Sequence, residues 1–242
     1  MASSPKFDSY FLPLSVLIGS IIIASAVFYA GPKGDYGAGP VGGQLPSAPV
    51  GGAKPAVAVD VKQVKTSGNP FVGSASAPIT IAYWFDYQCP FCKQYEQNVM
   101  STLVTDYVNT GKAKIVFKDY AFLGADSQTL SLAARAVWQV APSKFYAWHK
   151  NMFQNQGQEN SGWATTEKIR QLTQSVLGAA DTDKVIALMK SKATEFGAAI
   201  SADRQEGTAL GVTGTPSTII GKQLLIGARP YVDFKTAIDS LK

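Results

Sequence analysis

Two residues with reactive side chains stand close together in this sequence: Cys89 and Cys92, the only cysteines among 242 residues. They lie in the stretch DYQCPFCKQYE. Such a pair can staple the fold, supply half of a metal site, or exchange disulfide bonds with other thiols. A staple over two intervening residues closes too small a loop to restrict the unfolded chain much. A structural zinc site needs four Cys or His ligands, and His149 is the only further candidate. We therefore expect neither a metal nor a cofactor, and we favour redox chemistry.

The residues around the pair predict that it begins a helix. The stretch PITIAYWF over 78–85 is rich in β-branched and aromatic residues and predicts a buried strand. A short loop follows, and Pro90 suits the first position of a helix, which we expect to run to Val108. Residues three apart on a helix lie about 5–6 Å from each other, which is within reach of a disulfide bond.

The two cysteines should then differ in reactivity. The N-terminus of a helix carries a partial positive charge and free N–H groups, and both stabilise a thiolate on Cys89. Lys93 adds to this effect, whereas Cys92 lies one turn inside the helix and gains less. We therefore expect Cys89 to be an exposed nucleophile with a lowered pKa and Cys92 to be the resolving thiol. Stabilising the thiolate favours the reduced form, which makes the disulfide a better oxidant.

A second stretch, GVTGTPS over 211–217, places Thr215 and Pro216 directly before a predicted strand. Proline is disfavoured inside a sheet, and a cis bond is one way to turn the chain at this point. We expect a cis Thr215–Pro216 bond packed against the cysteines. The backbone of Thr215 would then be free to pair with an extended substrate.

Strands and helices alternate around these two motifs. The predicted elements are strands at 56–64, 78–85 and 113–122, a helical block from about 125 to 210, a hairpin at 217–227 that turns at Gly221-Lys222, and a last helix at 231–241. A strand–helix–strand order over 78–122 implies a parallel pair with a crossover helix. The apolar stripes of the helical block have the period of buried faces, and we expect His149 at their edge to be structural or exposed.

The N-terminal segment has a different composition. Residues 11–30 are 20 residues without a charge, the length of a membrane-spanning helix. Ala24 and Ala26 have the spacing of a cleavage site, so residues 1–30 are either a retained signal anchor or a cleaved signal peptide. In residues 31–55, thirteen of 25 are Gly or Pro, which predicts a flexible linker. Either alternative predicts that the domain formed by 56–242 is exported.

The charge of the chain gives no indication of a nucleic-acid partner. The net charge is +5, and the basic residues are scattered without a run of three. A surface that follows a phosphate backbone needs clustered Lys or Arg, so we expect no binding to nucleic acid.

The stretches FDYQCPFCK and GVTGTPS, separated by a helical insertion, make residues 69–241 resemble the DsbA-like branch of the thioredoxin superfamily. The resemblance implies an α/β thioredoxin-like fold with a helical insertion. In that fold Cys89 is the nucleophile, Cys92 resolves, Pro216 is a cis-proline that faces them, and Thr215 lines the substrate groove. It further implies an enzyme that introduces disulfides into exported protein thiols and is reoxidised by a redox partner in the membrane. Its catalytic domain would lie outside the cytoplasm, either tethered to the cell membrane or secreted after cleavage.

Two positions depart from the family pattern. The dipeptide between the cysteines is Pro-Phe, so the histidine found there in some strong oxidases is absent. Thioredoxin-like proteins often carry a buried acid six residues before the first cysteine, where this chain has Tyr83, and the nearest acid is Asp86. Proton transfer to Cys92 must therefore use water or another group.

Two alternatives to disulfide formation remain at this point. The same exchange chemistry run in reverse would make the protein a reductase or isomerase, although the chain has no spare domain for the dimerisation common among isomerases. A peptide-binding or chaperone-like module, in which the cysteines are structural, would need a stable and poorly oxidising disulfide.

Overall fold

The computed structural model describes residues 59–241, and its strands form one five-stranded sheet with the order β1-β3-β2-β4-β5. The strands are β1 Phe71–Val72, β2 Ile79–Phe85, β3 Ala113–Asp119, β4 Ser217–Ile220 and β5 Gln223–Ile226. β2 and β3 run parallel, and the other neighbouring strands are antiparallel. The predicted parallel pair and hairpin are both confirmed. The hairpin turns at Gly221, whose φ of 56° favours glycine.

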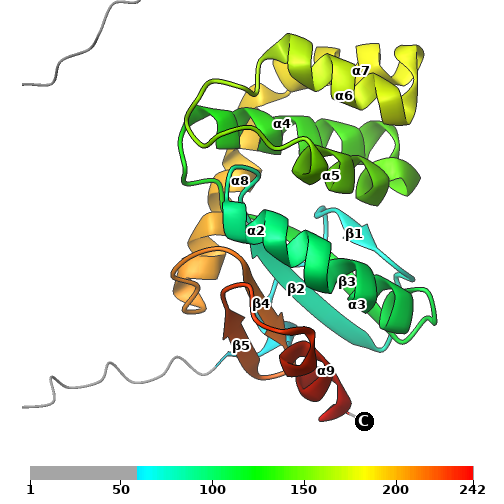
Figure 1. Ribbon diagram of the computed structural model, residues 1–242, viewed down its shortest axis with the longest axis vertical. Helices are drawn as coiled ribbons and strands as arrows, with labels where there is room; N and C mark the ends of the chain where they lie inside the picture. Colours follow the sequence, from blue (N-terminus) through cyan, green and yellow to red (C-terminus); the bar gives the residue numbers. More distant parts are fainter. Residues whose placement is uncertain (1–58, 242) are drawn as a thin grey trace, which may run out of the picture. The chain divides into compact units, whose positions relative to one another are not determined.

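A continuous run of helical backbone connects β2 to β3. It consists of α2 (Pro90–Tyr95), η2 (Glu96–Met100), α3 (Ser101–Leu103) and η3 (Val104–Val108). η2 and η3 are π-type turns within this run. Figure 1 shows the run lying along the sheet, and its inner face buries Tyr95, Met100 and Leu103 in the core. The helix predicted over 90–108 is thus confirmed.

The segment between β3 and β4 is helical, as its apolar periodicity predicts. Its elements are α4 (Ala125–Val140), η4 (Pro142–Lys144), α5 (Phe145–Gln154), α6 (Thr166–Leu177), α7 (Ala179–Ser191) and α8 (Ala193–Ala209). In Figure 1, α4 to α7 form a block next to the start of α2, whereas α8 leads back to the sheet and contacts β3. The block buries Leu130, Phe145, Trp148 and Ile169 completely. The last helix, α9 (Tyr231–Asp239), packs on β4.

The side chains of β2 alternate between two parts of the core. Tyr83 and Phe85 belong to the larger cluster, which includes the helix of 90–108, whereas Trp84 belongs to a smaller one. Successive residues of a strand point to opposite faces of the sheet, so the two clusters lie on opposite faces. Trp84 Nε1 donates to the Asp203 carbonyl at 3.0 Å. Gly207 on α8 leaves room for the indole, because a Cβ there would meet Trp84 Nε1 at 2.6 Å.

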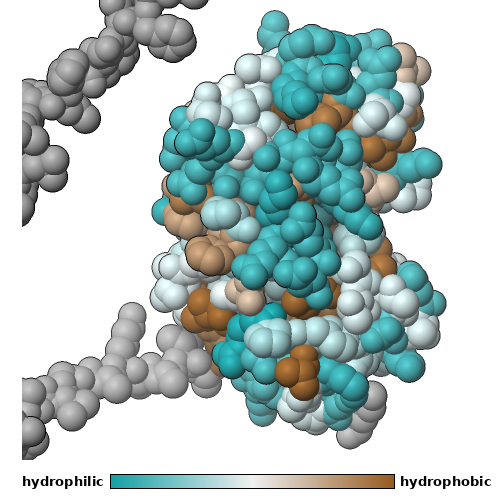
Figure 2. Space-filling view, viewed as in Figure 1, coloured by the Kyte–Doolittle hydropathy of each residue, from teal (hydrophilic) through white to brown (hydrophobic). Residues whose placement is uncertain are grey.

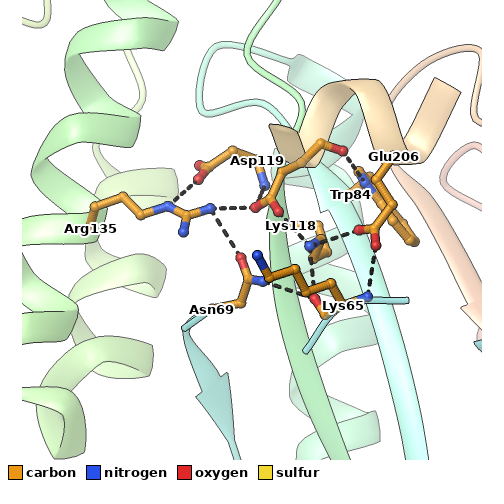
Figure 3. A network of polar contacts seen from close by, with 8 residues as sticks. Lys65, Asn69, Trp84, Lys118, Asp119, Arg135 and Glu206 are labelled. Atoms are coloured by element: carbon orange, nitrogen blue, oxygen red, sulfur yellow. Dashed lines mark hydrogen bonds and ion pairs between the residues drawn. The ribbon is translucent and has the colours of Figure 1, made fainter. Parts of the chain in front are cut away.

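Charged side chains gather around the end of β3 (Figure 3), and we call them the ion cluster: Lys118, Asp119, Arg135, Asp203 and Glu206. Lys118 pairs with Asp203, and its Nζ lies 2.8 Å from Glu206 Oε2. Arg135 pairs with Asp203, and its Nε lies 2.7 Å from Asp119 Oδ2. These residues come from β3, α4 and α8. The cluster therefore ties the helical insertion to the sheet.

The strand predicted at 56–64 is wrong over its described part. That part contains a 3-10 turn, η1 (Val61–Gln63), in which Asp60 Oδ1 accepts from the Lys62 N–H at 2.9 Å. Val59 and Val64 are buried in the smaller core cluster, and Val61 packs against it, without forming a strand. The first strand is β1, which has two residues, pairs with β3 and was not predicted.

The signal anchor or signal peptide predicted at 1–30 and the linker predicted at 31–55 lie outside the described residues. They stay predictions. Within residues 59–241, none of the helices has both the length and the apolar character needed to span a bilayer.

Candidate active site

Cys89 and Cys92 lie at the N-terminus of α2, as the sequence predicts. Cys89 is the N-cap residue, and Pro90 follows in the first turn. The backbone N–H groups of Cys92 and Lys93 donate to the Cys89 carbonyl at 3.1 and 3.2 Å. Both thiols are free, and Cys92 is 0% exposed. Cys89 is only 4% exposed, so the prediction of an exposed nucleophile is wrong: packing of the loop and the Thr215 segment buries most of it. Of the two sulfurs, only that of Cys89 can be reached from solvent without a structural change.

The pKa of Cys89 is lowered to about 6. The largest cause is a hydrogen bond with the Cys92 side chain, and burial opposes it. The Thr215 hydroxyl and the backbone N–H groups of Cys92 and Phe91 lower this pKa further. These N–H groups lie in the first turn of α2, so the predicted helix effect is present, although the neighbouring thiol contributes more. Lys93, expected to contribute, is not among the main causes.

The pKa of Cys92 moves in the opposite direction. Burial raises it well above that of an ordinary thiol, and Cys89 raises it further through a hydrogen bond and its charge. The pair therefore combines a thiolate with a protonated thiol at neutral pH. Chemically, this arrangement offers one nucleophile that is ready to react and one thiol that reacts only after losing a proton.

The loop of Thr215 and Pro216 lies against the pair, although Thr215 is 126 residues from Cys89 in the chain. The Thr215–Pro216 bond is cis, which confirms that prediction. In its thiol form, Cys89 Sγ donates to the Thr215 carbonyl at 3.4 Å. The four residues selected from the sequence, Cys89, Cys92, Thr215 and Pro216, thus lie together.

Asp86 holds the loop before Cys89 in place. Its carboxylate is 1% exposed and accepts four hydrogen bonds. Oδ1 accepts from the Gln88 N–H at 2.8 Å and the Ser127 hydroxyl at 2.6 Å. Oδ2 accepts from the N–H groups of Phe122 and Leu123 at 2.9 and 3.1 Å. The sequence drew attention to Asp86 as the acid nearest to the cysteines, but its four donors show that it positions the loop.

Two glutamines connect the same loop to the helical insertion. Gln88 Oε1 accepts from the Asn160 N–H at 2.7 Å. Gln156 Nε2 donates to the carbonyls of Tyr87 and Cys89 at 2.8 and 3.1 Å. No sequence pattern identifies these residues, because their partners are distant in the chain. For example, Asn160 lies 72 residues after Gln88. The insertion therefore helps to fix the position of the nucleophile.

A row of buried polar side chains lies on the inner side of α2. The Tyr87 hydroxyl is 2.9 Å from His149 Nδ1, and His149 Nε2 is 2.9 Å from Glu96 Oε1. His149 is completely buried, so the prediction of a structural histidine is confirmed and the exposed alternative is wrong. Glu96 is 5% exposed and lies one helical turn after Cys92. The sequence analysis did not select it.

The surface near Cys89 is partly apolar. Phe91 is 61% exposed, and Phe122, whose N–H bonds to Asp86, is 41% exposed. Figure 2 shows hydrophobic areas as separate patches on a largely hydrophilic face. In the part of the chain that the structure describes, no three His, Cys, Asp or Glu side chains are grouped as metal ligands would be.

Comparison with known proteins agrees with this geometry. Residues 65–240 match the model of a family described as thioredoxin. A curated relative, "Disulfide bond formation protein D" of Bacillus subtilis (strain 168), is 24% identical over 177 residues, which cover 73% of this chain and 78% of that protein.

Solved structures show the same fold. The crystal structure of BdbD from Bacillus subtilis in its oxidised form has a TM-score of 0.68 at 23% identity, covering 76% of this chain and 97% of that one. The thiol-disulfide exchange protein alpha-DsbA2 from Wolbachia pipientis has a TM-score of 0.65 at 25% identity, covering 75% of this chain and 91% of that one. The predicted α/β fold with a helical insertion is thereby confirmed.

Proposed function

Because the chain belongs to the thioredoxin family, we propose that it is a thiol–disulfide oxidoreductase whose Cys89–Cys92 pair introduces disulfide bonds into exported proteins. The observation that carries the proposal is the asymmetry of the pair. Cys89 has a pKa of about 6 at a helix N-terminus, and Cys92 is buried with a raised pKa. A stabilised thiolate favours the reduced enzyme and so makes its disulfide oxidising. The name of the Bacillus subtilis relative agrees with this direction.

The reaction is an exchange of sulfur–sulfur bonds. A substrate thiolate attacks Cys89 Sγ, a bond forms between the two sulfurs, and the Cys89–Cys92 bond breaks with its electron pair going to Cys92. A second substrate thiolate then attacks the substrate sulfur of the mixed disulfide. Cys89 leaves as a thiolate, for which its low pKa makes it well suited. The substrate has lost two electrons, and the enzyme is left as a dithiol.

Thr215 and Pro216 form the substrate-binding side of the site in this proposal. An extended peptide can pair with backbone groups beside Thr215, and Pro216 has no N–H that would compete for them. The exposed rings of Phe91 and Phe122 offer apolar contacts next to the nucleophile. The enzyme therefore accepts unfolded or extended segments in preference to one defined sequence.

We place the catalytic domain outside the cytoplasm, where disulfides persist. Residues 1–30 would anchor it to the membrane or direct its secretion, and a redox partner in the membrane would reoxidise the dithiol. The proposal is supported by the uncharged run at 11–30 in the sequence.

A trapping experiment tests the proposal. In Cys92→Ser the mixed disulfide on Cys89 cannot be cleared internally, so exported proteins should accumulate as adducts that a reductant removes on gels. Cys89→Ser is the matched control and should form none. Adducts on Cys89→Ser but not on Cys92→Ser would contradict the assigned roles. Equilibration of the wild-type pair with glutathione gives the direction, and a pair that remains oxidised at the glutathione ratio of the cytosol would favour a structural disulfide.

A further inference from the structure

One arginine differs from the others in what it contacts. The sequence has four arginines, and three of them pair with aspartates: Arg135, Arg170 and Arg229. The fourth, Arg204 on α8, is exposed and forms no ion pair with any of residues 59–241. Its guanidinium group therefore keeps its N–H donors available for a carboxylate of another molecule.

The two acids nearest to Arg204 in the sequence are occupied elsewhere. Asp203 pairs within the ion cluster. Glu206 Oε2 lies 2.8 Å from Lys118 Nζ, and Oε1 accepts from the Lys65 N–H at 2.7 Å. Figure 3 shows Glu206 turned toward these two lysines. The positive charge of Arg204 is thus not neutralised by its neighbours on α8.

The Tyr120 ring holds Arg204 in place. Arg204 Cζ lies over this ring, 5.8 Å from its centre, in a cation–π contact. The ring is fixed in turn, because its hydroxyl lies 3.1 Å from Thr208 Oγ1 and donates to the Val212 carbonyl at 3.1 Å. A guanidinium group on an aromatic face is restricted but keeps its N–H donors free at the edge. Binding a carboxylate therefore costs little further side-chain entropy.

Tyr120 also connects Arg204 to the substrate-binding side of the active site. Val212, to which its hydroxyl bonds, lies three residues before Thr215 in the same loop. The Tyr120 ring meets the exposed Phe122 ring edge-on at 5.6 Å, and Phe122 lies beside the loop that carries the nucleophile. A row of side chains in mutual contact thus leads from the nucleophile to Arg204.

The surface is hollowed at the end of this row. An open hollow of about 490 Å³ is lined by Ser201, Arg204, Gln205, Thr208 and Ala209. Arg204 is the one charged residue among them, and the others are small or uncharged polar residues. The hollow therefore offers room for a side chain of moderate size and favours a negative charge on it.

We propose that Arg204 binds an acidic side chain of the substrate segment that pairs beside Thr215, so that the enzyme prefers cysteines with an Asp or Glu nearby in the sequence. The inference rests on the proposed function, because it adds a charge preference to that site. The row includes contacts of 5.6 and 5.8 Å, which an extended segment crosses in about three or four residues. The acid would thus lie several residues from the cysteine.

The test compares substrate peptides that differ in one charge. The oxidised full-length protein is mixed with reduced peptides that carry two cysteines and a single Glu, which is moved stepwise along the peptide. Each has a matched peptide with Gln at the same position. Acid quenching and mass spectrometry give the rate constant of peptide oxidation. At low ionic strength the wild type should oxidise the best-placed Glu peptide about fivefold faster than its Gln partner, as expected of an exposed ion pair.

Two variants of Arg204 should change this preference. In Arg204→Gln the Glu and Gln peptides should react equally fast, and in Arg204→Glu the Gln peptide should be faster because like charges repel. In the wild type the preference should weaken as salt is added. The Gln peptide should keep its wild-type rate in Arg204→Gln, which shows that this variant is folded and active.

The controls separate a local contact from other effects of charge. Arg170→Gln removes the same charge from an exposed pair on α6 and should keep the wild-type preference. Arg204 is not among the main causes of the lowered pKa of Cys89, so alkylation of Cys89 should keep its midpoint near pH 6 in Arg204→Gln.

The inference and the proposed function fail in different ways. Equal rates for every Glu and Gln pair in the wild type would overturn the inference. A preference that survives in Arg204→Gln, or that is lost equally in Arg170→Gln, would also overturn it. If the wild type oxidises none of the peptides, including those with Gln, the proposed function itself is wrong.

Discussion

Two groups of buried polar side chains can be compared, one around the end of β3 and one beside Tyr83 and α2. In the ion cluster, beside Trp84, each of the three carboxylates faces a cation. Beside Tyr83, Glu96 pairs through one oxygen only, and its Oε2 has no hydrogen-bond partner among the described residues. Each carboxylate of the ion cluster has an oppositely charged partner, whereas Glu96 keeps one buried oxygen without a hydrogen bond.

This difference indicates what each group does. A buried charge is tolerated when its partner is in place, and removing one partner is strongly destabilising. The ion cluster joins elements far apart in the chain and leaves little capacity for further bonds, as expected of a structural connection. A buried oxygen without a partner costs stability, so Glu96 is less completely paired than a purely structural connection requires.

Breaking the ion cluster should have the largest effect on stability. Arg135→Met leaves Asp119 and Asp203 without their guanidinium partner. We expect the free energy of unfolding to fall by about 3–5 kcal/mol, measured by urea denaturation of the oxidised protein.

Arg170→Met is the matched control for this variant. It removes the ion pair with Asp183, in which the two side chains are 35% and 68% exposed. An exposed pair contributes about 0–1 kcal/mol, so this variant should remain close to the wild type. Similar losses in the two arginine variants would show that the ion cluster has no special structural role.

A smaller effect is expected from packing alone beside Trp84. Gly207→Ala places a methyl group 2.6 Å from the Trp84 indole nitrogen, and crowding of this kind costs about 1–3 kcal/mol. Gly197→Ala lies in the same helix, α8, where a Cβ meets no atom within 4 Å. It should stabilise the protein by up to about 1 kcal/mol, because alanine favours helices over glycine. Thermal denaturation should therefore move in opposite directions for the two variants, and a shift of equal sign would contradict this account of Trp84.

The sequence predicted well the features that depend on neighbouring residues. Pro90 directly after Cys89 locates the helix start, and Gly221-Lys222 locates the hairpin, because both depend on local backbone preferences. The strand proposed at 56–64 is wrong over 59–64, because valines such as Val59 and Val64 can also be buried on either side of a single turn. β1 was missed because its two residues are held by pairing with β3 and not by a pattern of their own.

The buried polar groups could not be predicted in the same way. Lys118 and Arg135 look like surface residues in the sequence, and their burial depends on Asp203, which lies 68 residues from Arg135. Glu96 likewise depends on His149, 53 residues away. The four site residues were found because a Cys pair before a helix and a Thr-Pro before a strand are recognisable without knowledge of such distant contacts.

The remaining predictions concern the thiol itself. Because the pKa of Cys89 falls to about 6 on folding from about 8.5 in an unfolded chain, its thiolate stabilises the reduced protein. By linkage this stabilisation is fully present above the unfolded pKa and is lost as pH falls through about 6. The stability of the reduced protein relative to Cys89→Ser should therefore rise from pH 6 to about 8.5, as urea denaturation at several pH values can measure.

Arg135→Met should leave this titration unchanged. The groups that lower the pKa of Cys89 are Cys92, Thr215 and the N–H groups of Phe91 and Cys92, and none belongs to the ion cluster. The alkylation rate of Cys89 should therefore follow a titration with its midpoint near pH 6 in both proteins, provided that the variant is measured where it is folded. A midpoint that moves with the loss of Arg135 would mean that the ion cluster and the cysteine pair are coupled, and that the ion cluster is not purely structural.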